Sequence, residues 1–414
     1  MTNLKIKISL FFNYFVFAIL LNSSGIAITQ VQNNFGVNSK AASWIDPCKD
    51  LSIAIMSFLV ASFIVRLGYK RAMLIALGVV SATCFIIPNV PSFLAIKLLF
   101  VIVGASFALI KMSVYSTIGI ITKDSKEHIR FMNFIESFFT VGNFALYFIF
   151  SYFIDDAHPE STAWLKSYYL IGGISIVAFL LLLTSNLDES GVQKNETEGS
   201  ANFFEMFTLM AKPIIVAFLC AAFFYVLVEQ SIQNFLPTFN QKVLQLPNAL
   251  SIQMGSILAG SYALGRFLAG VVLKKIPWFY VLISCLLLAA AMVLIAMPLA
   301  KNVNVSAATG WFDAPLAAYI FPLIGLFLAP IYPSINSAIL SSLPKSKHAL
   351  MSGLIIVFSA IGGSCGSLIT GFIFDLYDGT TAFYFTLVPI TILMISLFIF
   401  NRLHNKSKET AVTV

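Results

Sequence analysis

Long apolar segments recur along the whole chain, and each is about as long as a helix that crosses a membrane. A spanning α-helix needs about 20 predominantly apolar residues. The run from Leu10 to Thr29 is one example, and we expect twelve such segments in all. They are continuously apolar, so they predict helices and not the short alternating strands of a membrane barrel.

The composition supports this interpretation. Of the 414 residues, 59% are hydrophobic and only 10% are charged, whereas a soluble domain carries about 25% charged residues. A soluble core cannot bury so much apolar surface, because the ratio of surface to volume limits the buried fraction. The composition therefore excludes a cytosolic enzyme, a nucleic-acid-binding protein and a secreted disulfide-stabilised protein.

The expected fold class is an all-α polytopic membrane protein, with 12 transmembrane helices in two pseudo-symmetric six-helix bundles. We assign residues 1–185 to the N-terminal bundle, 186–209 to a polar cytoplasmic linker, and 210–414 to the C-terminal bundle. The expected spans are 8–29, 44–66, 71–89, 92–121, 128–154, 163–185, 210–240, 249–274, 277–299, 314–342, 348–374 and 380–401.

The distribution of basic residues predicts the orientation. Inner loops of membrane proteins are enriched in Lys and Arg. With both termini inside, most of the 25 Lys and Arg fall in the inner loops, and the outer loops hold only Lys40, Lys49, Lys166, Lys242 and Lys301. This placement explains the net charge of +7 without an anionic partner such as nucleic acid. We expect a bacterial inner membrane, with both termini cytoplasmic.

The two halves of the chain resemble each other. The expected fourth and fifth helices match the tenth and eleventh at one offset, about half the chain. The identities along this offset are Gly104 with Gly325, Ser113 with Ser334, Ser116 with Ser337, Ser125 with Ser346, Lys126 with Lys347, and Gly142 with Gly363. Duplicated halves around a central site are typical of secondary transporters.

Charged residues inside spans are costly and usually face the protein interior or a wet cavity. Lys111 and Glu136 lie at similar depths on adjacent antiparallel helices, so we expect them to meet. The pair is either a structural ion pair, or it lines the cavity and changes partner when substrate or a proton arrives.

Two further acidic positions are candidates for proton coupling. Glu229 lies deep in its helix and is followed by amides, a setting that suits a proton carrier. Asp46, Lys49 and Asp50 open the second expected span, where they either mark the outer interface or, in the case of Asp50, supply a gating or coupling charge.

Two basic segments with glycines lie at the inner ends of spans. The turn Arg66, Gly68, Lys70 and Arg71 follows the second span, and Arg266 lies near the end of the eighth. Basic groups at helix ends interact favourably with helix dipoles. We interpret these residues as gating elements, or otherwise as ordinary positive-inside anchors.

No pattern in the sequence predicts catalysis. There is no Walker sequence, metal-spaced His/Cys cluster or nucleophile elbow, and the five cysteines are dispersed, mostly in apolar runs. We therefore expect neither an enzyme nor a cofactor, and we treat the cysteines as packing residues.

These motifs resemble the major facilitator superfamily, and within it the fucose–galactose–glucose:proton symporter family, over nearly the whole chain. Segment 66–71 is similar to the superfamily's loop 2–3 signature, with Val65 where that signature has an acid. Asn133-x-x-Glu136, followed by Gly142, is similar to helix 5 of the family, and Phe223–Glu229 is similar to helix 7. Gly265–Phe267 is similar to helix 8, and Gly325–Phe327 together with Pro333–Ile335 is similar to helix 10.

Two acids of the fucose-symporter pattern are missing. The helix 1 region that carries Asn-Asp in that pattern reads Leu21-Asn22-Ser23-Ser24, and the helix 4 Glu is replaced at Lys111. Proton coupling would therefore have to use Glu136, Glu229 or Asp50. A cation at Lys111 also favours an anionic substrate, unless Glu136 neutralises it.

The predicted function is alternating-access transport of a small polar solute, sugar or sugar-like, with proton-coupled uptake. The alternatives are uptake of an organic anion, export of an amphiphile and, outside transport, a membrane receptor or a membrane-embedded enzyme. The expected partners are the solute, protons and the lipid bilayer, and the chain is expected to act as a monomer. The expected substrate-binding residues are Asn22, Lys111, Asn143, Gln233, Asn234, Tyr332 and Asn336.

Overall fold

The computed structural model describes residues 2–121, 125–187, 189, 208–301, 310–341 and 348–412. All regular secondary structure in these ranges is helical. The chain divides into two compact units: unit 1 holds residues 1–37 and 44–200, and unit 2 holds residues 38–43 and 201–414. The expected linker, 186–209, lies mostly outside the described residues.

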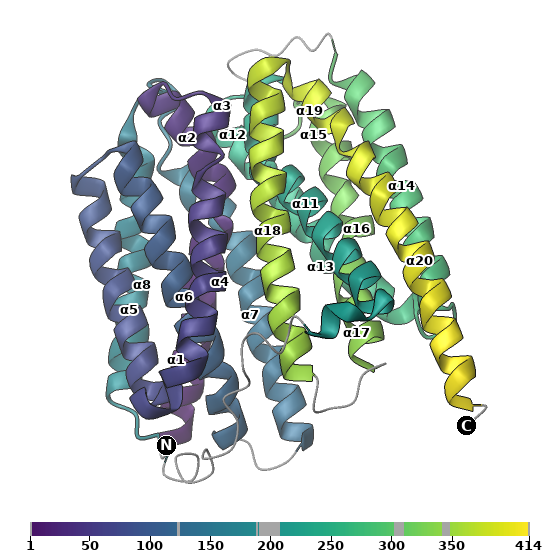
Figure 1. Ribbon diagram of the computed structural model, residues 1–414. Helices are drawn as coiled ribbons and strands as arrows, with labels where there is room; N and C mark the ends of the chain where they lie inside the picture. The colour runs from purple at the N-terminus through teal and green to yellow at the C-terminus, as the bar shows by residue number, and fades with distance from the viewer. Residues whose placement is uncertain are drawn as a thin grey trace. The chain divides into compact units, whose positions relative to one another are not determined.

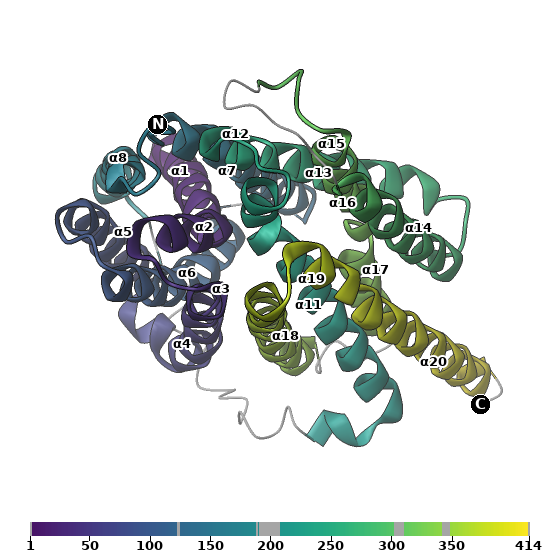
Figure 2. The ribbon, with the colours of Figure 1, turned by 90° about the horizontal axis from the view of Figure 1, so that it is seen from above.

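Unit 1 is a bundle of long helices (Figure 1). They are α1 (Thr2–Asn22), α2 (Ser24–Phe35), α4 (Ile45–Leu67), α5 (Tyr69–Ile86), α6 (Phe93–Ile121), α7 (Ser125–Tyr152) and α8 (Ser167–Leu183), with 3-10 turns at Ile87–Asn89 and Thr162–Lys166. The most extensive packing in the unit is between α4 and α6, α1 and α7, and α5 and α8. In the view from above, α6 lies among α4, α5 and α1, and it packs against all three (Figure 2).

Unit 2 is built around α11. Its helices are α3 (Ser39–Ala42), α11 (Pro213–Lys242), α12 (Asn248–Gln253), α13 (Gly255–Val272), α14 (Trp278–Leu299), α15 (Leu316–Ile320), α16 (Ile324–Leu328), α17 (Ile331–Ser341), α18 (His348–Leu376), α19 (Gly379–Phe385) and α20 (Leu387–Val412), with 3-10 turns at Leu209–Ala211 and Phe321–Leu323. Helix α11 packs against α18 and α20, and α13 packs against α16.

The internal repeat has a structural counterpart at two helix crossings. A Cβ on Gly104 of α6 would collide with the backbone carbonyl of Lys49 on α4. A Cβ on Gly325 of α16 would lie 3.0 Å from the carbonyl of Leu258 on α13. Small residues at such crossings let membrane helices approach closely. The repeated glycines therefore perform the same task in the two units.

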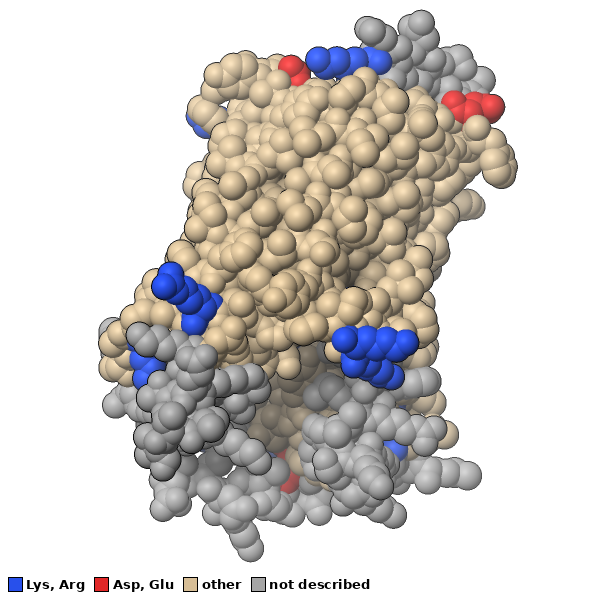
Figure 3. Space-filling model, turned by 90° about the vertical axis from the view of Figure 1, so that its right-hand side faces the viewer, with Lys and Arg blue, Asp and Glu red and all other residues tan. Residues whose placement is uncertain are grey.

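Ten helices among the described residues are long and apolar enough to span a membrane. Helices α4 and α7 occupy the positions of the expected spans 44–66 and 128–154, and some of their side chains lie outside the described set. The face over α14 and α20 carries its charged residues at the two ends and none across the broad middle (Figure 3). Exposed apolar side chains such as Leu287 and Phe398 suit contact with lipid.

Several spans expected to be continuous are broken. The first breaks at Ser23, the eighth at Met254, the tenth around the 3-10 turn Phe321–Leu323, and the twelfth at Thr386. Prolines account for the last two breaks, at Pro322 and just after Thr386 at Pro389, because proline lacks the amide hydrogen that continues a helix. No proline lies at Ser23, whose hydroxyl donates a 2.8 Å hydrogen bond back to Leu20 O.

One short segment of the loop between α2 and α4 packs within unit 2. Helix α3 lies against α18. Asn38 Nδ2 donates a 2.9 Å hydrogen bond to Asp375 Oδ2, and the Lys40 ammonium lies 5.1 Å from the centre of the Phe372 ring. A Cβ on Gly371 would lie 2.6 Å from Ser43 Cβ, so α3 fits closely onto α18 at this glycine.

Candidate functional site

In unit 2, Glu229 of α11 belongs to a network of tyrosines. The Tyr225 hydroxyl, one turn earlier, donates a 2.8 Å hydrogen bond to Glu229 Oε1. The Tyr225 ring stacks on Tyr332 of α17, with ring centres 5.5 Å apart and planes at 21°. The Tyr332 hydroxyl shares a 2.8 Å hydrogen bond with Ser359 Oγ of α18. One carboxylate is thus linked through two stacked rings to three helices.

Two other polar groups lie near this network. Arg266 of α13, expected as a gating residue, is exposed and interacts electrostatically with both Glu229 and Tyr225. Asn336 lies one helical turn after Tyr332, and its Oδ1 is buried without a hydrogen-bond partner among the described residues. Buried polar atoms are rarely left unsatisfied, so Asn336 offers an acceptor to a polar ligand.

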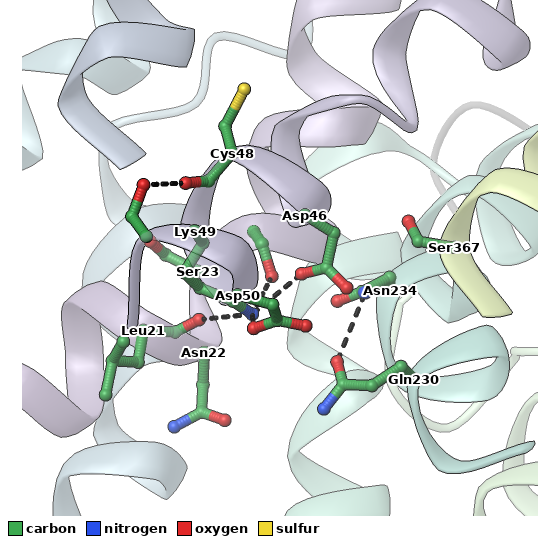
Figure 4. Close-up of polar contacts among 12 residues, drawn as sticks. Leu21, Asn22, Ser23, Asp46, Cys48, Lys49, Asp50, Gln230, Asn234 and Ser367 are labelled. Atoms are coloured by element: carbon green, nitrogen blue, oxygen red, sulfur yellow. Dashed lines mark hydrogen bonds and ion pairs between the residues drawn. The ribbon is translucent and has the colours of Figure 1, made fainter. Parts of the chain in front are cut away.

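The amides that follow Glu229 along α11 are partly paired with each other. Asn234 is buried, and its Nδ2 donates a 3.2 Å hydrogen bond to Gln230 Oε1 (Figure 4). Gln233 is half-buried. Gln233 and Asn234 are expected binding residues, and Gln230 is an additional member of the group.

In unit 1, the expected binding residue Lys111 lies beside aromatic side chains. Its ammonium lies 5.8 Å from the centre of the Phe107 ring, one turn earlier on α6. Phe107 in turn contacts Phe17 of α1 and Phe139 of α7, with ring centres 5.9 and 6.4 Å apart. The Glu136 side chain lies outside the described residues, so its pairing with Lys111 stays a prediction.

The remaining polar candidates in unit 1 differ in their hydrogen bonding. Asn143 of α7 is half-buried, and its Oδ1 has no partner among the described residues. The equivalent repeat position in unit 2 is Ser364, whose buried Oγ also has no hydrogen-bond partner among the described residues. Asn22 Nδ2 donates a 2.8 Å hydrogen bond to Ala18 O within its own helix. Asn143 is therefore better placed than Asn22 to receive a polar ligand.

Asp46 and Lys49 are buried and form an ion cluster with Asp50, which is half-buried. Asp46 is 0% exposed and Lys49 only 5%. The Lys49 ammonium lies 2.7 Å from Asp46 Oδ1 and 3.5 Å from Asp50 Oδ1. A position near a helix start does not reveal what packs over it, so the sequence alone does not indicate this burial.

The cluster also spans the break between α1 and α2. Lys49 Nζ donates 3.3 Å hydrogen bonds to Leu21 O and Ser24 Oγ, on either side of Ser23 (Figure 4). A helix break exposes carbonyls that have lost their amide partners. The Lys49 ammonium satisfies one of them.

The expected gating turn is fixed by an acid that sequence reasoning missed. Gly68 separates α4 from α5 with φ of 87°, a conformation that favours glycine. The Glu189 carboxylate accepts hydrogen bonds from the backbone N–H groups of Tyr69 (2.9 Å) and Lys70 (2.7 Å) at the start of α5. Glu189 thus supplies negative charge at a turn where Val65 replaces the acid of the superfamily signature.

The basic residues of this turn divide into two kinds. The Lys70 ammonium donates to Leu183 O (3.1 Å) and Ser185 O (2.5 Å), which close the end of α8. Arg66 and Arg71 are exposed. Lys70 and Glu189 therefore connect the start of α5 to the end of α8, and nothing in the sequence pattern signals this contact.

Comparison with known proteins identifies the family. The model of the major facilitator superfamily matches residues 10–321, well over half of the chain. The chain belongs to this superfamily. It is therefore a multi-pass membrane protein with the fold of solute transporters. No curated protein matches it.

Solved structures of other superfamily members share the fold. A mutant of the nucleoside transporter NupG superposes with a TM-score of 0.75 at 15% identity, covering 97% of this chain and 100% of that one. A D-xylose–proton symporter gives 0.72 at 12% identity, covering 97% of each chain. A mutant of the E. coli fucose:proton symporter FucP gives 0.61 at 16% identity, covering 97% and 99%. At such low sequence identity, these similarities establish only that the fold is shared.

Proposed function

We propose that this protein is a secondary active transporter for a small polar solute, sugar or sugar-like, and that uptake is proton-coupled. The observation that carries the proposal is the network of Glu229, Tyr225 and Tyr332 in unit 2. It joins an ionisable group to a stacked pair of aromatic rings, of which Tyr332 is partly exposed, and a ring face suits the apolar face of a sugar. The printed names of the similar structures, which include a xylose–proton and a fucose:proton symporter, agree with this class of substrate.

In the proposed mechanism, Glu229 carries the coupling proton. Its protonation state changes how firmly Tyr225 is held next to the substrate site. An ionised Glu229 accepts the Tyr225 hydrogen bond. A protonated carboxyl has less acceptor capacity and gains a donor, so the Tyr225 hydroxyl, and with it the ring stacked on Tyr332, is held less firmly. Substrate contacts at Tyr332, Asn336, Gln233 and Asn234 would then differ between the two protonation states.

Unit 1 supplies the other proposed contacts. Asn143 and Lys111 would hold polar groups of the solute, with Asn22 of α1 as a further contact, while Glu136 and Asp50 are the other candidate proton sites. The turn of Arg66, Gly68, Lys70 and Arg71 would act as a gate that keeps helices fixed on the inner side. We further propose that the two bundles alternate access as bodies in a bacterial inner membrane, with both termini cytoplasmic.

Uptake of an organic anion is the second candidate, because Lys111 is an exposed cation on α6. Removal of Lys111 separates the two candidates. Lys111→Gln should abolish uptake of an anion such as a sugar acid, and it should change uptake of a neutral sugar much less.

Uptake into proteoliposomes tests the proposal. The panel holds neutral sugars, nucleosides, sugar acids and small carboxylates, with and without an inward proton gradient. We expect one neutral solute to accumulate only with the gradient, and Glu229→Gln to abolish accumulation while preserving gradient-independent exchange. Accumulation of an amphiphile, or none of any solute, would instead support export.

A further inference from the structure

The Lys49 ammonium occupies a cage of oxygen atoms in unit 1. Asp46 Oδ1 lies at 2.7 Å, Leu21 O and Ser24 Oγ at 3.3 Å, and Asp50 Oδ1 at 3.5 Å. The oxygens come from two carboxylates one helical turn apart on α4 and from both sides of the α1–α2 break (Figure 4). The cage is therefore assembled from two segments of the fold that are distant in sequence.

This set of ligands is the type that binds a hard cation. Hard cations select carboxylate, carbonyl and hydroxyl oxygens. In transporters, unwound backbone and the C-terminal ends of broken helices coordinate the coupling ion. Leu21 lies at such an end, in the last turn of α1, where the helix dipole is negative. Without the lysine side chain, the same oxygens would surround an unoccupied site of negative charge.

The charge count of the cluster leaves room for one more positive charge. Two carboxylates face one ammonium. Asp46 Oδ2 is buried and has no hydrogen-bond partner among the described residues. A buried, unpaired carboxylate oxygen is costly. A single proton on the cluster would neutralise the remaining charge, and it needs no space at the centre.

We propose that Lys49 is a tethered cation in an alkali-cation site, so that the wild-type cluster accepts a proton and excludes Na⁺. The consequence for transport, that uptake uses protons and not Na⁺, rests on the proposed function. The exclusion of Na⁺ from the cage does not depend on it. Lys49 is then the residue that determines which cation this cage accepts, and its removal opens the site to Na⁺.

The ionisable groups around the cluster do not provide a competing explanation. Asp50 interacts electrostatically with Lys49 and Asp46. Helix α2 carries no ionisable side chain, and the start of α6 carries Lys97, whose ammonium lies 4.6 Å from the centre of the Phe93 ring. The basic residues of α5 lie at its first turn, at the opposite end of α4. Within unit 1 the cage is thus the local source of negative charge.

Thermal unfolding of purified Lys49→Met in detergent is the direct test. Ligand that binds only the folded state raises Tm. We expect Na⁺ to raise the Tm of Lys49→Met by at least about 3 °C relative to choline at equal ionic strength, and to leave wild-type Tm unchanged. Lower pH should weaken the Na⁺ effect, since protons compete for the same carboxylates. Equal responses of wild type and variant would overturn the proposal.

Two double variants control for the identity of the ligands and for the folding of Lys49→Met. Asp46→Ala with Lys49→Met removes the carboxylate that lies nearest to the ammonium, at 2.7 Å, and should show no Na⁺ response. If Lys49→Met does not fold, Lys49→Met with Asp50→Asn leaves a single carboxylate in the cage, and it should still bind Na⁺, more weakly. A folded version of this double variant without a Na⁺-dependent shift would contradict the inference.

Transport separates this inference from the proposed function. In proteoliposomes, a Na⁺ gradient should leave wild-type uptake unchanged and stimulate uptake by Lys49→Met. Absence of uptake by wild type would refute the proposed function, while the Na⁺-dependent Tm shift would still support the cage. Stimulation of wild type by Na⁺ would overturn the inference while leaving transport intact.

Discussion

Glu189 Oε1 accepts a 2.7 Å hydrogen bond from the backbone N–H of Lys70, 119 residues earlier in the chain. Its other oxygen accepts from Tyr69. The carboxylate therefore caps the first turn of α5, where unpaired N–H groups and the positive end of the helix dipole favour an anion. A segment that follows α8 thus fixes the turn that the sequence analysis had assigned to gating.

Loss of this cap should destabilise unit 1. Glu189→Ala removes two acceptors and should lower the free energy of unfolding by about 1–2 kcal/mol. Glu189→Gln keeps one acceptor oxygen, so its free energy of unfolding should fall by less. Thermal unfolding in detergent measures the effect, with Glu160→Ala, an exposed acid in the loop before α8, as the control. Equal Tm values for Glu189→Ala and the control would refute the capping role.

Gly68 should tolerate no side chain. Its φ of 87° is strained for any other residue, and a Cβ would lie 2.8 Å from Glu189 Oε2. We expect Gly68→Ala to lower stability by about 2 kcal/mol. Gly173→Ala is the matched control, because this helical glycine of α8 has nothing within 4 Å of the added Cβ. It should be neutral or stabilise by about 0.5–1 kcal/mol.

Local sequence predicted those features that depend on local composition. Apolar length located the helices, since each span must bury its own backbone hydrogen bonds in lipid. The repeat predicted that Gly104 and Gly325 have equivalent positions, and both lie at helix crossings. Glu229 was recognisable because an acid deep in an apolar helix requires a partner.

Contacts between distant segments were not predictable in this way. Glu189 lies in a polar stretch that resembles a solvated linker, and only the fold shows that it caps α5. Lys49 lies near a helix start, where a lysine usually reaches the interface, and only the break at Ser23 reveals its burial. Glu189 binds two backbone N–H groups, and Lys49 binds the backbone carbonyl of Leu21 in addition to its side-chain partners. Backbone groups have no signature in the sequence.

His158 should titrate above its usual range. The hydrogen bond and charge of Asp155, 3.0 Å away in the exposed loop before α8, raise the pKa of His158 and lower the pKa of Asp155. The pair is therefore intact between the ordinary values of 3.8 and 6.5. It weakens as pH rises through the pKa of His158 or falls through that of Asp155. An NMR titration of the histidine should show a lower pKa in Asp155→Asn.

The Tyr225–Glu229 hydrogen bond should matter for transport more than for folding. Tyr225→Phe keeps the ring that stacks on Tyr332 and removes the hydroxyl that donates to Glu229. Since a hydrogen bond to a charged group contributes about 1.5–3 kcal/mol, we expect kcat/KM for proton-driven uptake to fall at least about tenfold. Tyr319→Phe, a tyrosine of α15, is the control.

A double-mutant cycle locates the effect on the pair. If Tyr225 acts through Glu229, then adding Tyr225→Phe to Glu229→Gln should cost much less than Tyr225→Phe alone, because contacting residues are non-additive. The pH profile of uptake should change in both single variants, a response that a packing defect would not produce. Additive losses, with an unchanged pH profile in Tyr225→Phe, would mean that the hydroxyl has only a structural role and that coupling resides at another acid, such as Asp50.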